Sequence, residues 1–343
     1  MRFEVENGVL EKYTEEDGIT EAVIPDGVTS IGNKAFRVCK NLESVRIPKS
    51  VTSIGNMAFA CCGNLQSVEL SEGLTSIEDG VFCYCKNLRN INIPESVTSI
   101  GNEAFRNCLS LESITIPDSV TSIGEYAFGS CVSLQSIVIL YGVTSIGDNA
   151  FCTCLNLQSI TIPDSVTSIG ESAFWGCRSI RTLNIPDSVV KIGNEAFVNC
   201  NLLKSLTIFG YTVDATQCNW EEINPSEILS MLNSKDYFVE MDCPTKYQFV
   251  AQVFLKDNQP EAEVFIRRNL SKILRYFIDI NDYDTVKGLL DSGKFITRRN
   301  IMKFVDYAIV NTQKGGDMQI QIYIADYKNR KFPDTNPLKD LKF

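Results

Sequence analysis

The chain repeats itself every 23 residues, without a slip, from Ile24 to Ile208. Three positions make the period visible, because each carries one kind of side chain in repeat after repeat. These positions are an aliphatic one (Ile24, Ile47, Leu70, Ile93, Ile116, Ile139, Ile162, Ile185, Ile208), an aromatic one (Phe36, Phe59, Phe82, Phe105, Phe128, Phe151, Phe174, Phe197) and a cysteine (Cys39, Cys62, Cys85, Cys108, Cys131, Cys154, Cys177, Cys200). A fixed period of about 20–29 residues predicts a solenoid, in which each repeat forms one rung.

One repeat shows how a rung is built. The L-x-x-I-x-I spacing that ends at Ile116 is typical of a leucine-rich repeat. Ile114 and Ile116 alternate with Thr115, so the two isoleucines are predicted to point inward and the threonine outward from a strand. Pro117 ends that strand. Phe128 is predicted on a short helical turn that drives its ring into the centre, so that the phenylalanines form a continuous aromatic spine.

Charge and composition exclude several classes of function. The chain contains no histidine, which removes Ser-His-Asp and Cys-His catalysis and every His-ligated metal site. The net charge is −10, and residues 1–209 carry 14 Lys and Arg against 23 Asp and Glu. Binding to nucleic acid depends on Lys and Arg neutralising phosphates, so an acidic solenoid is poorly suited to it. We therefore expect no enzyme, no cofactor, no metal and no nucleic-acid partner.

The thirteen cysteines have a simpler explanation than disulfides. Eight form the single column above. Stacked strands lie about 4.8 Å apart, but their side chains point the same way, which makes the disulfide dihedral angle hard to reach. We therefore predict buried free thiols that pack as small apolar residues. The remaining five match no zinc motif of the C-x-x-C type: Cys61, Cys83, Cys152, Cys218 and Cys243.

The start of the chain and the free thiols both bear on location. Residues 1–6 include no apolar core of a signal peptide, and no stretch approaches the ~20 apolar residues of a membrane span. Many free thiols favour a reducing compartment. The sequence therefore predicts a cytoplasmic protein without a membrane span, and the alternative is a cell-surface protein exported by a non-standard route.

The expected fold is α+β, in three parts. Residues 1–19 form an N-terminal β-hairpin cap, with Asn7-Gly8 as its type I′ turn. Residues 20–209 form the leucine-rich repeat solenoid, with about eight 23-residue repeats. Residues 210–343 form a small helical domain.

The repeat resembles a known family. The run I-P-D-S-V-T-S-I-G-x-x-A-F-x-x-C, as in Ile162 to Cys177, looks like the BspA-like leucine-rich repeat, and the likeness covers about residues 20–209. The resemblance implies a right-handed, curved solenoid. It also implies a bacterial repeat protein. Some members of the family are surface proteins tied to adhesion.

The C-terminal region reads as helices that begin near Pro225, Pro244, Pro260, Tyr283 and Thr297. Residues 284–293 resemble the outer helix and turn of an ankyrin repeat, although the T-P-L-H signature is absent. Alternation of Met318, Ile320, Ile322 and Ile324 fits a strand by period alone. Residues 325–332 resemble the tail of some bacterial proteins with a BspA-like solenoid, which favours a helix over 317–329.

The outward strand position is the natural ligand face of such a solenoid. One rung also breaks the pattern, because Leu140-Tyr141 stands where most rungs have Pro and an acidic residue, which predicts an exposed apolar patch with Val138. The candidate partner-binding residues are Arg46, Glu69, Asn92, Thr115, Val138, Leu140, Tyr141, Thr161 and Asn184.

These residues favour a non-catalytic scaffold that binds a protein partner through the solenoid surface. The alternative is a cell-surface adhesin or a glycan-binding module. Regular Thr-Ser columns, from Thr29-Ser30 to Thr167-Ser168, are read as hydrogen-bonded surface ladders, with an ordered glycan as the less favoured ligand. The sequence does not identify the partner.

Overall fold

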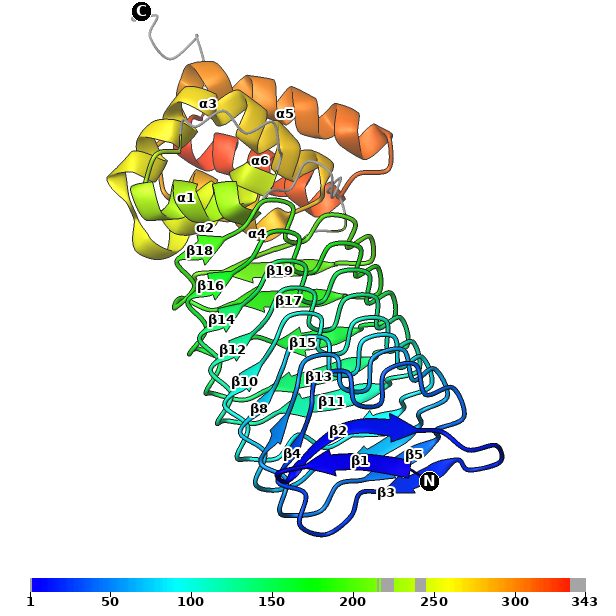
Figure 1. The fold of residues 1–343 in the computed structure, drawn as a ribbon. Helices are drawn as coiled ribbons and strands as arrows, with labels where there is room; N and C mark the ends of the chain where they lie inside the picture. The colour runs from blue at the N-terminus through cyan, green and yellow to red at the C-terminus, as the bar shows by residue number, and fades with distance from the viewer. Residues whose placement is uncertain (1, 215, 217–224, 238–244, 334–343) are drawn as a thin grey trace, which may run out of the picture. The chain divides into compact units, whose positions relative to one another are not determined.

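The computed structural model describes residues 2–214, 216, 225–237 and 245–333. The chain forms two compact units, Met1–Ser230 and Met231–Phe343. The first unit holds all the described strands, and the second holds most of the helices (Figure 1). The division falls within α1 (Pro225–Ser234).

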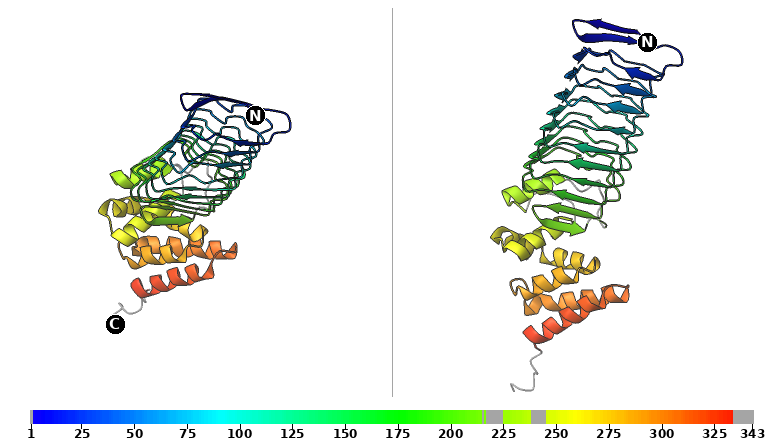
Figure 2. Two further views of the ribbon diagram at one scale, coloured as in Figure 1. Left: turned by 60° about the horizontal axis from the view of Figure 1, so that its bottom comes forward. Right: turned by 90° about the horizontal axis from the view of Figure 1, so that it is seen from below.

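Each rung of the solenoid contributes strands to two separate parallel stacks, which Figure 2 shows rung above rung. The first stack comprises β3 (Glu21–Val23), β5 (Ser44–Arg46), β7 (Ser67–Glu69), β9 (Asn90–Ile91), β11 (Ser113–Ile116), β13 (Ser136–Ile139), β15 (Ser159–Thr161), β17 (Thr182–Ile185) and β19 (Ser205–Ile208). The second comprises β4 (Ser30–Ile31), β6 (Ser53–Ile54), β8 (Ser76–Ile77), β10 (Ser99–Ile100), β12 (Ser122–Ile123), β14 (Ser145–Ile146), β16 (Ser168–Ile169) and β18 (Lys191–Ile192).

The strands pair one period apart. Ile114 lies opposite Ile137 in the first stack, and Ile123 lies opposite Ile146 in the second. Ile114 and Ile116 are buried and Thr115 is exposed, as the alternation predicts. Within residues 2–214 the solenoid makes about nine turns, which confirms the predicted leucine-rich repeat fold.

A third side of each rung is a run of tight turns, here called the turn ladder: residues 34–41 and their equivalents every 23 residues up to 195–202. Tyr126, Phe128 and Ser130 donate their backbone N–H groups to carbonyls of the next rung at 2.8–3.0 Å. The helical turn expected here is wrong, because Tyr126 (φ 52°) and Ser130 (φ 60°) are left-handed. This backbone directs alternate N–H groups toward the neighbouring rung.

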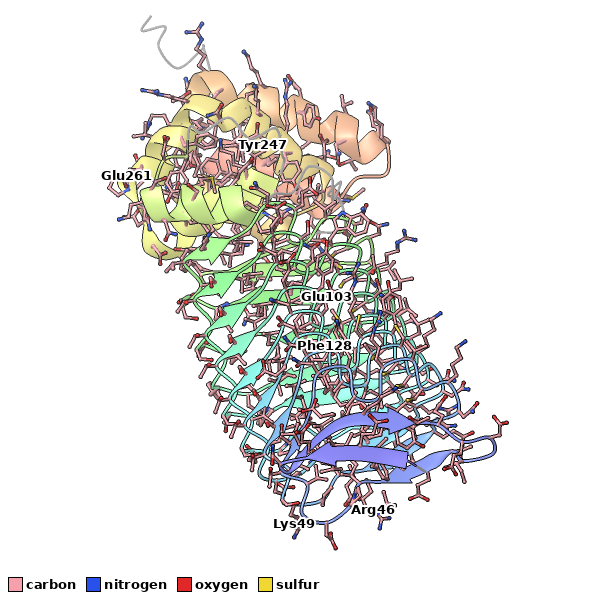
Figure 3. All side chains as sticks on the ribbon, viewed as in Figure 1. Arg46, Lys49, Glu103, Phe128, Tyr247 and Glu261 are labelled. Carbon is pink, nitrogen blue, oxygen red and sulfur yellow. The ribbon has the colours of Figure 1, made fainter. Side chains whose placement is uncertain are left out.

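The phenylalanine column forms the predicted aromatic spine. All eight rings are buried, and successive ring centroids lie 4.7–5.6 Å apart in stacked geometry. Phe128, which is labelled in Figure 3, stacks on Phe105 at 5.1 Å and on Phe151 at 5.3 Å. Each large ring buries about 150–250 Å², so this column forms much of the core.

The cysteine column donates hydrogen bonds to backbone carbonyls of the phenylalanine column. The thiol of Cys131 donates to the carbonyl oxygen of Phe105 at 3.2 Å, and this contact occurs in seven rungs in all, at 3.0–3.5 Å. Burial raises the pKa of the Cys108, Cys131 and Cys177 thiols well above the ordinary value. The eleven cysteines in the described part of the chain are free thiols, and Cys218 and Cys243 lie outside it.

We expect titration of the denatured protein, without reductant, to find nearly all 13 thiols. In the native protein the column cysteines should react slowly even at mildly alkaline pH. Burial keeps the reagent away from these thiols, and the raised pKa of Cys108, Cys131 and Cys177 also keeps those three as neutral thiols, which are weak nucleophiles. Comparing labelling kinetics of native and denatured protein tests both statements. Four or more disulfides in the denatured protein would contradict the buried-thiol interpretation.

Both ends of the solenoid carry antiparallel hairpins. β1 (Arg2–Glu6) and β2 (Val9–Thr14) form the predicted hairpin, and β2 pairs with β4. Its Tyr13 stacks on Phe36 at 4.8 Å and so extends the spine by one ring. At the other end, β20 (Tyr211–Asp214) pairs with β19 across a Phe209-Gly210 turn. These hairpins cover strand edges that would otherwise be unpaired.

The helical unit contains the remaining elements of the described chain: α2 (Thr245–Asp257), α3 (Pro260–Asp279), α4 (Tyr283–Asp291), α5 (Arg298–Gln313) and α6 (Met318–Lys331). α3 packs against α2, α4 and α5, and α6 packs against α4 and α5. The predicted starts are confirmed at Pro225, Pro260, Tyr283 and Thr297. Thr297 forms a capping box with Asn300. Pro244 lies outside the described residues.

The alternating segment before the tail is helical, as the tail resemblance predicts and the period alone does not. α6 begins after Asp317, whose side chain accepts the N–H of Gln319. Ile320 and Ile324 are buried, one helical turn apart, while Met318 and Ile322 face solvent. The strand interpretation is therefore wrong, because a spacing of four residues fits one face of a helix.

Candidate functional site

The candidate residues lie where the alternation places them, on the outward face of the first strand stack, here called the strand face. The stack register puts Arg46 beside Glu69, and Val138 between Thr115 and Thr161. Seven of the predicted residues form this one column, all of them exposed: Arg46, Glu69, Asn92, Thr115, Val138, Thr161 and Asn184.

The strand face is hollowed at its N-terminal rungs. A cavity of about 690 Å³ is lined there by Arg46, Lys49, Glu69 and Glu72, among others. Arg46 and Glu69 form an exposed ion pair across adjacent rungs, with Arg46 Nε 3.6 Å from Glu69 Oε2. Arg46 and Lys49 are labelled in Figure 3. Exposed pairs of this kind contribute little to stability, so these charges remain accessible to a ligand.

The apolar break in the middle of the strand face consists mainly of Val138 and Tyr141. Their exposed fractions are 48% and 72%. Leu140 is only half-buried rather than fully exposed, which corrects part of the predicted patch. Its backbone N–H donates to the carbonyl oxygen of Ile116 at 3.1 Å, and the Tyr141 N–H donates to Asp118 Oδ1 at 2.8 Å. Both bonds hold this irregular segment against the preceding rung.

The threonine column on the opposite stack is bound into the solenoid itself. The Thr121 hydroxyl donates to the carbonyl oxygen of Thr98 at 3.2 Å, and Thr144 donates to Thr121 at 3.1 Å. Four residues of this column make such bonds at 3.1–3.2 Å: Thr98, Thr121, Thr144 and Thr167. These hydroxyls therefore have a structural role whether or not a ligand binds.

Two further findings bear on the chemistry available. Among residues 2–214, 216, 225–237 and 245–333, no three His, Cys, Asp or Glu side chains come together as a metal-binding group. Over the same ranges, no helix has the length and apolar character needed to cross a bilayer.

Sequence reasoning missed a set of residues on the turn ladder. Val38, Met57 and Tyr84 are exposed apolar side chains there. The signal was available, because polar residues or glycine occupy the equivalents of Val38 and Tyr84 in the later rungs. It could be interpreted only after the backbone conformation of the turns was known.

Comparisons with known proteins agree with the repeat. The family model described as "BspA type Leucine rich repeat region" matches residues 11–135 and 121–215, with 6 copies. No curated protein matches the chain.

Several solved structures are similar to part of this chain. A leucine-rich repeat protein from Bacteroides ovatus is 26% identical, with 60% of this chain and 68% of that chain covered and a TM-score of 0.43. The leucine-rich repeat protein of T. pallidum is 29% identical, with 59% and 87% covered and a TM-score of 0.47. A leucine rich cell surface protein from Faecalibacterium prausnitzii is 23% identical, with 60% and 86% covered and a TM-score of 0.32. Because the family model spans residues 11–215, well over half of the sequence, the chain belongs to the BspA-type leucine-rich repeat family.

Proposed function

We propose that the solenoid is a non-catalytic scaffold that binds a protein partner through its strand face. One observation carries the proposal: a continuous column of exposed side chains, which vary in type from rung to rung, lies on a solenoid whose buried positions repeat. Solenoids use extended faces of this kind for binding. The hollow lined by Arg46 and Glu69 adds charged groups, and Val138 with Tyr141 adds an apolar anchor.

Specificity should come from the places where the repeat breaks. Uniform rungs give a partner little to distinguish one rung from the next. Val138 and Tyr141 lie amid serine and threonine side chains. An apolar and aromatic anchor surrounded by polar groups has the composition of an interaction hot spot.

Changing Val138 to Thr and Tyr141 to Asp should weaken partner binding at least tenfold, about 1.4 kcal/mol. Each change introduces the residue of the neighbouring rungs, as in Thr115 and Asp118, and leaves the backbone donors in place. Leu140 stays unchanged, because a proline there would remove its N–H bond to Ile116. The test is to capture partners from native lysate with the full chain and to titrate a purified partner against both forms.

The matched control is Val190→Thr. Val190 is 69% exposed and interrupts the threonine column on the other stack, so this change also restores the repeat but on a different face. The Val190→Thr variant should bind the partner with the same affinity as the unchanged chain. Equal binding by all three proteins would exclude the central strand face as the site.

The location and the glycan alternative have separate tests. Cytoplasm stays the predicted location, and fractionation of the native cells distinguishes it from the cell surface. An exported adhesin or glycan-binding module would appear in the surface fraction. It would also bind immobilised glycans through the same column of exposed residues.

A further inference from the structure

The turn ladder carries an irregularity that the strand face does not explain. Each segment of the turn ladder has two left-handed positions, and the second of them has φ between 55° and 72°. Asparagine and glycine suit this conformation, whereas a β-branched or bulky residue there is an outlier. The later rungs mostly carry small polar residues or glycine, whereas the first three carry Val38, Cys61 and Tyr84.

These three residues occupy adjacent rungs and form one surface. The N–H of Val38 donates to the carbonyl oxygen of Ala60 at 2.9 Å, and that of Cys61 donates to Cys83 at 2.7 Å. Val38 is 42% exposed and Tyr84 is 41% exposed. The apolar side chains are thus stacked along the ladder rather than scattered.

Met57 enlarges this surface. It is 41% exposed and lies over Gly80 of the next rung, where an added Cβ would be 3.1 Å from Met57 Cγ. Val38, Met57, Cys61 and Tyr84 are here called the turn patch. Its residues suit neither the left-handed backbone nor water, and such misfits gather at functional sites.

The charge around the turn patch is opposite to that of the chain. The turn ladder carries six Lys and Arg against two Glu. The rest of residues 1–209 carries eight Lys and Arg against 21 Asp and Glu. Five of the six basic residues lie in the first four segments: Lys34, Arg37, Lys40, Lys86 and Arg106. Among the described residues, no ion pair engages Lys34, Arg37, Lys40 or Lys86.

Arg106 lies next to the turn patch, in the fourth segment of the turn ladder and one rung after Tyr84. Its guanidinium lies 3.2 Å from Glu103 Oε1 and 4.6 Å from the centroid of the Tyr126 ring (Figure 3 labels Glu103). Glu103 is the one acidic residue in these four segments, and this ion pair offsets it. The surface left for a ligand is therefore apolar in the middle and mainly basic at the rim, where Glu15, which accepts the Asn41 N–H at 2.7 Å, adds one carboxylate beside the first segment.

We propose that the turn patch docks an acidic segment of a partner protein that also carries apolar side chains. The apolar residues would bury against Val38, Met57 and Tyr84. The acidic residues would meet the lysine and arginine rim, which speeds and orients association. A long polyanion fits less well, because the rest of the solenoid is strongly acidic and would repel it.

The test begins with selection of displayed random peptides on the full-length protein. We expect enrichment of peptides in which Asp or Glu alternates with Leu, Phe or Trp. Their affinity should fall with added salt, because the rim charges are exposed. Enrichment of basic or uncharged peptides, or of none, would overturn the proposal.

The decisive variant is Val38→Asn with Tyr84→Asn. Asparagine occupies this position in other rungs, as at Asn107 and Asn199, and tolerates the left-handed backbone. The variant should keep or gain thermal stability and lose at least tenfold in affinity for the enriched peptides. Loss of stability instead would show that Val38 and Tyr84 are structural.

A second pair of variants separates charge and site. Lys34→Gln with Lys86→Gln should weaken peptide binding and reduce its salt dependence. Val138→Thr with Tyr141→Asp should leave peptide binding unchanged, so failure of the strand-face proposal and failure of this one are distinguishable. Co-sedimentation with phosphatidylserine vesicles, or binding of single-stranded DNA, that the Val38→Asn, Tyr84→Asn variant abolishes would replace the peptide with a membrane or a nucleic acid.

Discussion

Replacing Phe128 by Ala is expected to lower the free energy of unfolding by about 3–5 kcal/mol. The ring is fully buried in the middle of the solenoid and stacks on Phe105 and Phe151 at 5.1 and 5.3 Å. Alanine removes the transfer free energy of the ring and leaves a cavity. Stacked rungs are joined to each other by backbone ladders on three sides, so they cannot easily close around it.

Denaturant unfolding followed by circular dichroism measures this loss. Thr115→Ala is the control, because Thr115 lies in the same repeat as Phe128 but is exposed on the strand face. Its effect should stay within about 0.5 kcal/mol. A loss below about 1 kcal/mol for Phe128→Ala would mean that the aromatic column is not central to stability.

The columns of the solenoid were predictable because burial repeats. Ile114, Phe128 and Cys131 each have equivalents in many rungs, so a single periodic pattern specifies the core. The exposure of the strand-face column follows from the same alternation. The N-terminal hairpin was predictable from Asn7-Gly8, whose φ angles of 50° and 80° fit the type I′ turn.

The turn ladder was not predictable, because its backbone depends on the next rung. A-F-x-x-C reads locally as a helical turn, yet Phe128 donates its N–H to Ala150 rather than within its own rung. Local helix propensity carries no information about a hydrogen-bond partner in the next rung. Tyr13 and β20 were missed for a different reason. Tyr13 lies one period before Phe36, so its place in the aromatic spine could be predicted from the repeat. Phe209-Gly210 forms a hairpin turn, and the glycine there is a sequence signal for β20.

The candidate site was predictable in position but not in shape. Alternation places Val138 outward, and the structure agrees. The half-burial of Leu140 depends on its N–H bond to Ile116, which a proline in that position could not make. The hollow near Arg46 depends on how side chains of several rungs fill the face. Neither follows from the period alone.

The second large effect is expected from Gly142→Ser, which should lower the free energy of unfolding by about 2–3 kcal/mol. By consensus the change looks harmless, because most rungs carry serine there: Ser50, Ser96, Ser119, Ser165 and Ser188. The structure predicts otherwise. A Cβ on Gly142 would overlap the carbonyl oxygen of Asp118 and lie 2.8 Å from that of Val120. Backbone atoms cannot move aside as a flexible side chain can.

Gly73→Ser is the matched control for this prediction. Gly73 occupies the same repeat position, and its rung also lacks the proline, with Ser71 in its place. A Cβ on Gly73 would meet its nearest neighbours at 3.6 Å, an ordinary contact, so the change should cost less than about 0.5 kcal/mol. Equal losses in the two variants, measured by denaturant unfolding, would rule out the close approach to Asp118 as the cause. Replacing Leu140-Tyr141-Gly142 by Pro-Asp-Ser, as in Pro163-Asp164-Ser165, restores the neighbouring geometry and should recover most of the loss.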